Sequence, residues 1–102
     1  MNEALVLARR AGEVGEIPVG AVVVHRGTII ATGHNETEAA RDPTAHAEML
    51  AIRRAAAALG DARLPECELY VTLEPCAMCA SAISHARLRR MVFGAYDPKG
   101  GA

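Results

Sequence analysis

The sequence is poor in aromatic residues and contains no tryptophan. Only 3% of its 102 residues are aromatic, and alanine supplies much of the 51% that are hydrophobic. We therefore expect thin, closely packed layers in which helices present alanine faces to their neighbours. A chain of this length can bury one core but is well below the size at which chains divide, so residues 1–102 should form a single domain.

Long hydrophobic runs and a strong net charge are also missing. No apolar run approaches the ~20 residues that span a bilayer, and the first residues lack the pattern of a cleaved signal peptide. We therefore expect a cytoplasmic protein without membrane contact. The formal net charge of -1 excludes a broad basic field, so any affinity for nucleic acid must come from local arginines. Arg87, Arg89 and Arg90 form the obvious cluster, although such residues commonly act only as solvated cations at a helix end.

Cysteine is scarce as well, and the spacing of the three cysteines is informative. In a chain without a secretory signal they indicate metal binding or catalysis rather than a disulfide framework. Cys67 stands alone beside a predicted strand and should be a small buried hydrophobic residue. Cys76 and Cys79 follow Pro75, a residue favoured at the first helical position, so both thiols should share one face at a helix start, where thiolates are favoured. This spacing allows the two sulfurs to bind a single ion or to contact each other.

Hydrophobic periodicity and turn signals predict a helix, a hairpin, and then helices alternating with strands. The expected helices are 2–15, 42–59 and 75–87, the expected strands are 21–24, 28–33, 69–73 and 91–95, and 36–41 is expected to be an exposed loop. Asp42-Pro43 is interpreted as the N-cap and first position of the second helix. Each of the two later helices connects two strands as a crossover, which indicates parallel strands in a mixed sheet and a three-layer α/β/α fold.

Two predicted helix starts contain residue types that bind metal. His46 alone would more commonly be a hydrogen-bonded structural histidine. However, the helix starts that hold His46 and the two thiols lie at or beside the carboxyl ends of strands, so they can converge. One imidazole and two thiolates leave a fourth zinc position open, which is the catalytic rather than the structural pattern. Glu48 lies on a different side of its helix from His46, so it suits a proton carrier better than a ligand.

The pattern His46-x-Glu48 followed by Pro75-Cys76-x-x-Cys79 is that of the zinc-dependent base deaminases. The surrounding sequence resembles the bacterial tRNA-specific adenosine deaminases of the cytidine/deoxycytidylate deaminase superfamily. The resemblance covers nearly the whole chain and is clearest in residues 17–22, 42–48, 70–79 and 93–102. A histidine before Ala-Glu fits these enzymes and disfavours the free-cytidine deaminases, which typically have a cysteine there.

The resemblance implies a cytidine-deaminase-like fold and a hydrolase that converts adenosine to inosine at the wobble position of a tRNA anticodon loop or in a similar single-stranded nucleic acid. His46, Cys76 and Cys79 would bind one zinc ion per chain, and Glu48 would move protons. The implied substrate contacts are Asn35 to the base or ribose, Pro18 and Val19 in the base pocket, and Asp97 and Lys99 to the RNA backbone. Asp97 also fits an ordinary turn. A homodimer would build the substrate site across its interface.

The sequence departs from this family at its C-terminus, because family members continue with a further strand and helices. We therefore expect the strand at 91–95 to have an unpaired edge and the protein to self-associate or to be poorly soluble. Two alternative functions stay open. One is a deaminase of a free nucleobase, nucleoside or nucleotide such as guanine or cytosine. The other is a zinc-binding scaffold without activity, in which the metal supplies folding energy.

Overall fold

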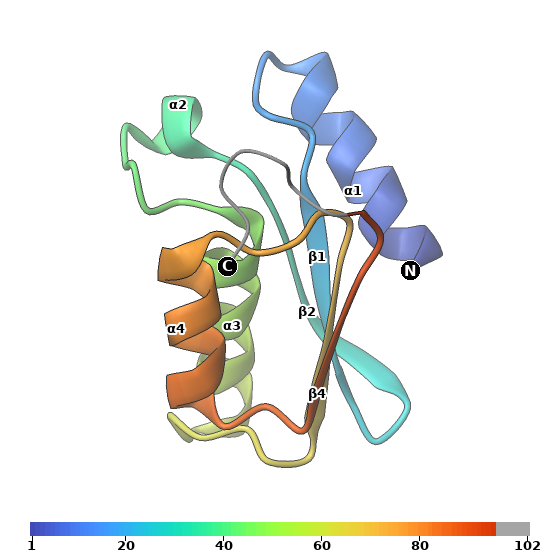
Figure 1. Cartoon of the computed structure of the whole chain (residues 1–102), viewed down its shortest axis with the longest axis vertical. Helices are drawn as coiled ribbons and strands as arrows, with labels where there is room; N and C mark the ends of the chain where they lie inside the picture. Colours follow the sequence, from blue (N-terminus) through green and yellow to red (C-terminus); the bar gives the residue numbers. More distant parts are fainter. Residues whose placement is uncertain (96–102) are drawn as a thin grey trace.

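The structure is a computed structural model that describes residues 1–95. Along the chain lie α1 (Asn2–Glu13), β1 (Gly20–His25), β2 (Thr28–His34), α2 (Thr37–Ala40), α3 (Ala47–Leu59), β3 (Cys67–Val71), α4 (Ala77–Ala86) and β4 (Arg90–Phe93), as Figure 1 shows. Asp97 and Lys99 lie outside the described residues. Among the described residues, no helix combines the length and the apolar character needed to cross a membrane.

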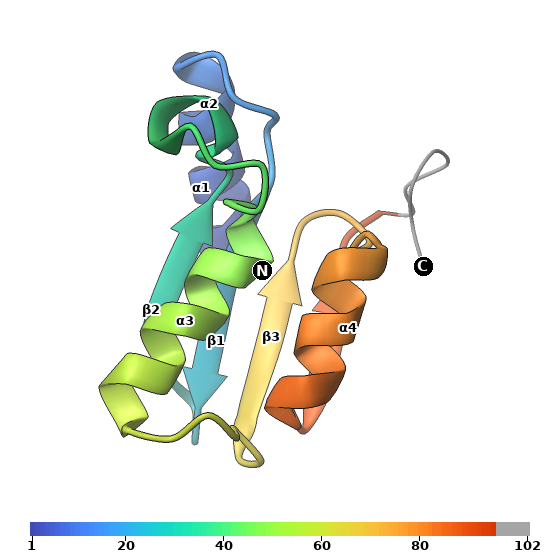
Figure 2. The same cartoon turned by 90° about the vertical axis from the view of Figure 1, so that its left-hand side faces the viewer.

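The strands form one mixed sheet in the order β2-β1-β3-β4. β1 pairs antiparallel with both β2 and β3, and β3 pairs parallel with β4. Helix α1 covers one face of the sheet, and α3 and α4 cover the other (Figures 1 and 2). The predicted three-layer α/β/α fold with a mixed sheet is therefore confirmed, and β2 and β4 are the edge strands of the described part.

The layers approach one another closely at two glycines, one facing each helical layer. A Cβ atom on Gly20 would overlap the carbonyl oxygen of Ala4 in α1. A Cβ atom on Gly33 would lie 2.5 Å from the carbonyl oxygen of Ala47 in α3. Real Cβ atoms do not tolerate such contacts, so these glycines let the helix backbones rest directly on the sheet. The thin layers expected from the alanine-rich composition are present.

The main core lies between the sheet and the α3–α4 layer. Its fully buried side chains include Val23, Leu64, Leu69 and Val71, surrounded by alanines of α3. Cys67 is also fully buried in this core, which confirms its prediction as a small hydrophobic residue. A smaller cluster on the opposite face joins α1 to the sheet.

The predicted start of the second helix is wrong. Asp42 and Pro43 lie in a turn, and α3 begins only at Ala47. The side chain of Asp42 accepts hydrogen bonds from the N–H of Thr44 at 2.8 Å and from its hydroxyl at 2.7 Å. This local turn uses the same residue types as a helix N-cap, so the sequence signal suits both structures.

The segment predicted as an exposed loop, 36–41, contains the short helix α2. No side chain of its own caps this helix at the N-terminus. Its amide groups are instead bound by Glu16, which lies about 20 residues earlier in the loop after α1. A partner so distant leaves no local signal in the sequence, which explains why a loop was predicted, whereas most of the segment is exposed as predicted.

Candidate metal centre and active site

The predicted metal ligands lie at the starts of α3 and α4, and Figure 2 shows that both helices begin at the same end of the sheet. His46 is the N-cap of α3 and Cys76 is the N-cap of α4, and both have extended backbone conformations. Neither side chain caps its own helix, so both are free to point elsewhere. Cys79 lies in the first turn of α4. Two helix starts therefore direct one imidazole and two thiols to one place.

The three side chains have the spacing of a zinc site. Nδ1 of His46 lies 3.7 Å from Sγ of Cys76 and 3.5 Å from Sγ of Cys79. Tetrahedral coordination with normal Zn–S and Zn–N bond lengths requires a nitrogen–sulfur separation of about 3.6 Å. All three ligand atoms lie within 4.8 Å of one another. The donor set and the geometry both fit zinc.

The charge balance at this group favours a bound cation. Burial raises the pKa of the Cys79 thiol, and the nearby carboxylate of Glu48 and the thiol of Cys76 raise it further. This opposes the expectation that a helix start alone favours the thiolate. A cation would supply the missing positive charge, and zinc ligation by cysteine requires the thiolate.

Glu48 lies beside the ligand group without being part of it. Its residue is only 4% exposed, in the first turn of α3. Burial raises the pKa of Glu48 above its ordinary value of 4.5, while its own backbone N–H and the neighbouring His46 act in the opposite direction. A carboxyl group with a raised pKa can both accept and donate a proton near neutral pH, which suits general acid–base chemistry.

A pocket of about 130 Å³ opens next to the predicted metal ligands. It is lined by Ile17, Val19, Asn35, Thr37, His46, Glu48, Leu73, Glu74 and Cys76. Of the residues expected to contact substrate, Val19 and Asn35 lie on its wall, whereas Pro18 is exposed and is not among the lining residues. The sequence reasoning did not identify Ile17, Thr37, Leu73 or Glu74. Ile17 is next to Pro18, and Leu73 lies three positions before Cys76, so closeness along the chain to predicted site residues was the available signal.

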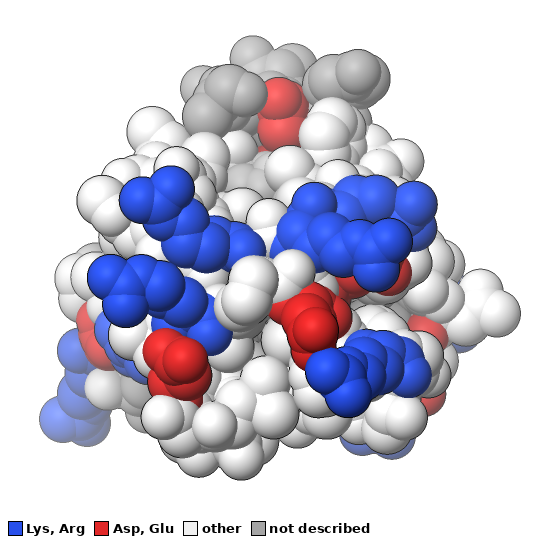
Figure 3. All heavy atoms as spheres, turned by 90° about the horizontal axis from the view of Figure 1, so that it is seen from below, with Lys and Arg blue, Asp and Glu red and all other residues white. Residues whose placement is uncertain are grey.

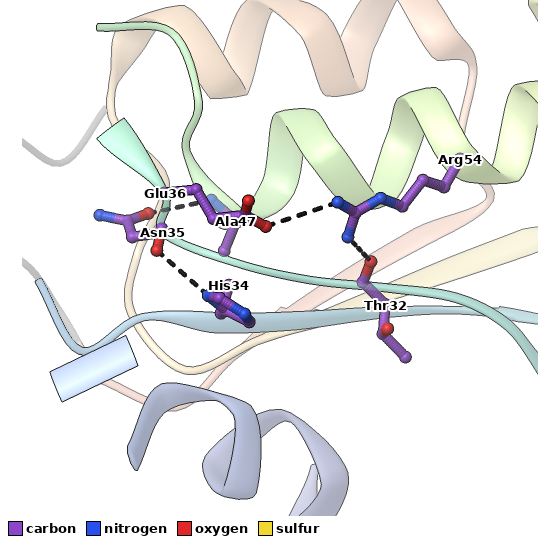
Figure 4. Close-up of polar contacts among 6 residues, drawn as sticks. All are labelled: Thr32, His34, Asn35, Glu36, Ala47 and Arg54. Atoms are coloured by element: carbon purple, nitrogen blue, oxygen red, sulfur yellow. Dashed lines mark hydrogen bonds and ion pairs between the residues drawn. The ribbon is translucent and has the colours of Figure 1, made fainter. Parts of the chain in front are cut away.

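Asn35 is buried, with 4% of its surface exposed, and connects β2 to α3. Its Oδ1 atom accepts the N–H of Ala47 at 2.9 Å, as Figure 4 shows, and its own N–H donates to the carbonyl of Val19 at 3.1 Å. Asn35 therefore caps α3 from a distance. The side-chain NH₂ group points away from Ala47 in Figure 4, which leaves it as a donor for a molecule in the pocket.

Arg54 of α3 braces the strand that leads to Asn35 (Figure 4). One guanidinium nitrogen donates to the carbonyl of Thr32 at 2.8 Å, and another lies 3.4 Å from the carboxylate of Glu36. The ion pair itself is exposed and contributes little. The bond to the backbone of edge strand β2 nevertheless fixes the end of that strand beside the pocket.

The arginine cluster does not lie near the pocket. Arg87, Arg89 and Arg90 follow α4, at the opposite end from Cys76 (Figure 1). Figure 3 shows that end of the molecule, where acidic side chains are interspersed among the arginines. Arg90 donates to the hydroxyl of Tyr70 at 3.0 Å and pairs with Glu68 at 3.6 Å. At least this arginine has a structural role.

The sequence matches known proteins along its whole length. Residues 1–95 match the family model described as the zinc-binding region of cytidine and deoxycytidylate deaminases. A tRNA-specific adenosine deaminase of Agrobacterium fabrum is 60% identical over 102 residues, which cover 100% of this chain and 67% of that protein. A tRNA-specific adenosine deaminase of Bacillus subtilis is 54% identical over 99% of this chain and 63% of its own length. The chain thus spans about two thirds of these relatives.

Solved structures give a consistent result. A structure from a study of A-to-I editing by tRNA deaminases at the wobble position is 60% identical and superposes with a TM-score of 0.98, covering 100% of this chain and 74% of the other. A guanine deaminase from Bacillus subtilis is 44% identical with a TM-score of 0.90, covering 93% of this chain and 61% of the other. Purine deaminases acting on RNA and on a free base therefore share this architecture.

Proposed function

The chain belongs to the family of cytidine and deoxycytidylate deaminases with a zinc-binding region, and we propose that it deaminates adenosine to inosine at the wobble position of a tRNA anticodon loop. The observation that supports this most strongly is the convergence of His46, Cys76 and Cys79 with buried Glu48 at one pocket. The choice of substrate rests on the 60% identity to a tRNA-specific adenosine deaminase over the full length of this chain.

We assign one zinc ion per chain to His46, Cys76 and Cys79. When bound, zinc lowers the pKa of a water molecule to about 7 and acts as a Lewis acid. The three side chains are positioned by the starts of α3 and α4, so the chain holds them in place before the substrate binds. Such preorganisation is what a catalytic site requires.

Glu48 is the proton carrier of the proposed reaction. Its carboxylate accepts the two protons of the attacking water in turn, and it delivers the first to N1 of the purine and the second to the departing amine. The overall change consumes one water and releases one ammonia, and it converts adenosine to inosine. Because Glu48 is buried in the wall of the pocket, bulk water has little access to its carboxyl group.

A small pocket of this kind suits a single base removed from its stack rather than a stretch of RNA. The side-chain NH₂ group of Asn35 donates a hydrogen bond to the base or ribose, and Val19 and Ile17 contact the flat face of the base. Pro18 stays a proposed contact at the rim. Asp97 and Lys99 are proposed to contact the RNA backbone, and a cytoplasmic homodimer is proposed as the working form, because the resemblance to tRNA-specific adenosine deaminases implies both.

A free-base deaminase is the second candidate, and the guanine deaminase of 44% identity favours it. Guanine and adenine have the same ring system, so the volume of the pocket does not separate them. The higher identity and the complete coverage of this chain favour the tRNA substrate.

The decisive experiment offers the zinc-loaded protein an anticodon stem-loop RNA, adenosine, guanine and cytosine separately, with Glu48→Ala as control. Inosine formed only in the RNA supports the proposed function. Product from guanine alone favours the second candidate. Zinc retention without product from any substrate would mean that the protein is a metal-binding scaffold.

A further inference from the structure

Glu16 is a buried carboxylate outside the metal centre, in the loop between α1 and β1. It is 6% exposed, and its own N–H donates to the carbonyl of Ala11 at 2.9 Å. Oε1 accepts the N–H of Glu38 at 3.1 Å and the hydroxyl of Thr37 at 3.4 Å, and Oε2 accepts the N–H of Ala39 at 2.8 Å. A buried charge needs such bonds to both oxygens, so the position of this carboxylate is fixed.

The helix α2 depends on this carboxylate for its position. It has four residues, far fewer than a helix needs to be stable alone. The N–H groups of Glu38 and Ala39 belong to its first turn, where backbone donors have no partner within the helix. Its N-cap, Glu36, provides no side-chain bond to them. Glu16 is therefore the group that holds α2 against the loop after α1.

The same contact joins two walls of the pocket. Ile17 and Val19 follow Glu16 directly and line one wall, while Thr37 and Asn35 line the wall that leads into α2. The N–H of Asn35 donates to the carbonyl of Val19 at 3.1 Å, which gives a second link between the walls. Glu16 thus sets the separation of side chains that face the ligand, although it is not itself a lining residue.

Building on the proposed function, we propose that Glu16 is a positioning residue for the nucleoside, which strengthens binding by fixing Thr37 relative to the loop that contains Ile17. Glu16 does not touch the reacting atoms. The metal ligands and Glu48 belong to the starts of α3 and α4, and Glu16 has no hydrogen bond to either helix among the described residues. Removing its carboxylate should therefore weaken substrate binding and leave the chemical step nearly unchanged.

The variant Glu16→Gln removes one acceptor with little change in shape. A carboxylate only accepts hydrogen bonds, whereas a glutamine must turn its NH₂ group toward one of the donors of α2. Glu13→Gln is the matched control, because Glu13 is exposed near the end of α1 and loses the same charge. Binding is measured in the Glu48→Gln background, so that no turnover occurs, with an anticodon stem-loop RNA that contains adenosine at the wobble position.

We expect Glu16→Gln to weaken RNA binding by about five-fold or more relative to Glu13→Gln, as the loss of a charge-assisted hydrogen bond would produce. With Glu48 present, KM should rise while kcat stays within about two-fold. Amide hydrogen exchange at Glu38 and Ala39 should accelerate in Glu16→Gln only. Equal RNA affinity in the two variants, or a loss of kcat at unchanged KM, would overturn the proposal.

Two further results keep the test decisive. If the parent protein binds no RNA, the proposed tRNA function fails, and amide exchange alone decides the role of Glu16: unchanged exchange at Glu38 and Ala39 overturns the positioning role. If Glu16→Gln does not fold, Ala39→Pro replaces it, because proline removes the donor of the shortest hydrogen bond to the Glu16 carboxylate. Unweakened RNA binding by a folded Ala39→Pro variant also overturns the proposal.

Discussion

Nδ1 of His46 lies 3.5 Å from Sγ of Cys79, although 33 positions separate the two residues along the chain. This contact joins the first turn of α3 to the first turn of α4 and brings the second thiol, Cys76, to the same imidazole at 3.7 Å. Because both helices begin at one end of the sheet, the ligands meet beside the pocket that contains Glu48. The fold therefore places a His/Cys/Cys group that could hold a metal ion and a buried carboxyl group beside one small pocket.

The first prediction concerns the metal. Cys76→Ser should reduce bound zinc from about one equivalent per chain to a small fraction, because it removes a thiolate ligand. The unfolding temperature should also fall, because the free energy of zinc binding no longer stabilises the folded state. Metal content by mass spectrometry and a thermal melt measure both effects. Cys67→Ala is the control, since Cys67 is buried in the core away from the ligand group. Equal zinc loss in the two variants would contradict the assignment.

The second prediction separates the two roles of Asn35. Asn35→Asp keeps the oxygen that accepts the N–H of Ala47 and removes the NH₂ donor, so RNA affinity should fall by about five-fold or more while stability changes little. Asn35→Ala removes both groups and should also lower the free energy of unfolding by about 1 kcal/mol, the usual value of a lost cap. RNA binding and chemical denaturation measure the two quantities. A fully active Asn35→Asp variant would exclude a substrate contact by the NH₂ group.

The third prediction concerns acid stability. The backbone N–H of Ala39 is the largest of several hydrogen-bonding contributions that hold the pKa of Glu16 below its ordinary value of 4.5. The folded state therefore prefers the ionised form, and this stabilisation is complete above pH 4.5 and disappears as the pH falls through the lowered pKa. The unfolding free energy of the parent should exceed that of Glu16→Gln near neutral pH, and the difference should shrink in acid. A difference that is independent of pH would contradict this origin.

The fourth prediction tests the close contact between β2 and α3. The added methyl group of Gly33→Ala would lie 2.5 Å from the carbonyl oxygen of Ala47, so we expect the free energy of unfolding to fall by about 1–3 kcal/mol, as for other overpacked sites. Gly12→Ala is the control, because its Cβ would make an ordinary 3.4 Å contact with Pro18 and alanine is the better helix former. Denaturant titrations should therefore show a loss for Gly33→Ala only. Equal stability of Gly33→Ala and the parent would contradict the tight packing.

The convergence of His46, Cys76 and Cys79 could be predicted from the sequence, because the two motifs place these residues at helix starts beside the carboxyl ends of strands. The start of α3 could not be predicted, because Asp42 followed by proline suits both a helix N-cap and the turn that is present. Helix α2 and the contribution of Thr37 to the pocket depend on Glu16, which lies elsewhere in the sequence. Such tertiary contacts are not encoded in local periodicity. For the same reason, the burial that raises the pKa of Cys79 could not be read from its position at a helix start.

The central claim is that Glu48 moves protons beside a metal held by His46, Cys76 and Cys79. The most direct test is the single-turnover rate of inosine formation in an anticodon stem-loop RNA by the zinc-loaded parent and by Glu48→Gln. We predict that Glu48→Gln lowers this rate by about 10²–10⁴-fold, the usual contribution of a general acid–base, while its zinc content and RNA affinity match those of the parent. A Glu48→Gln variant that forms inosine at the parental rate with zinc fully bound would contradict the claim.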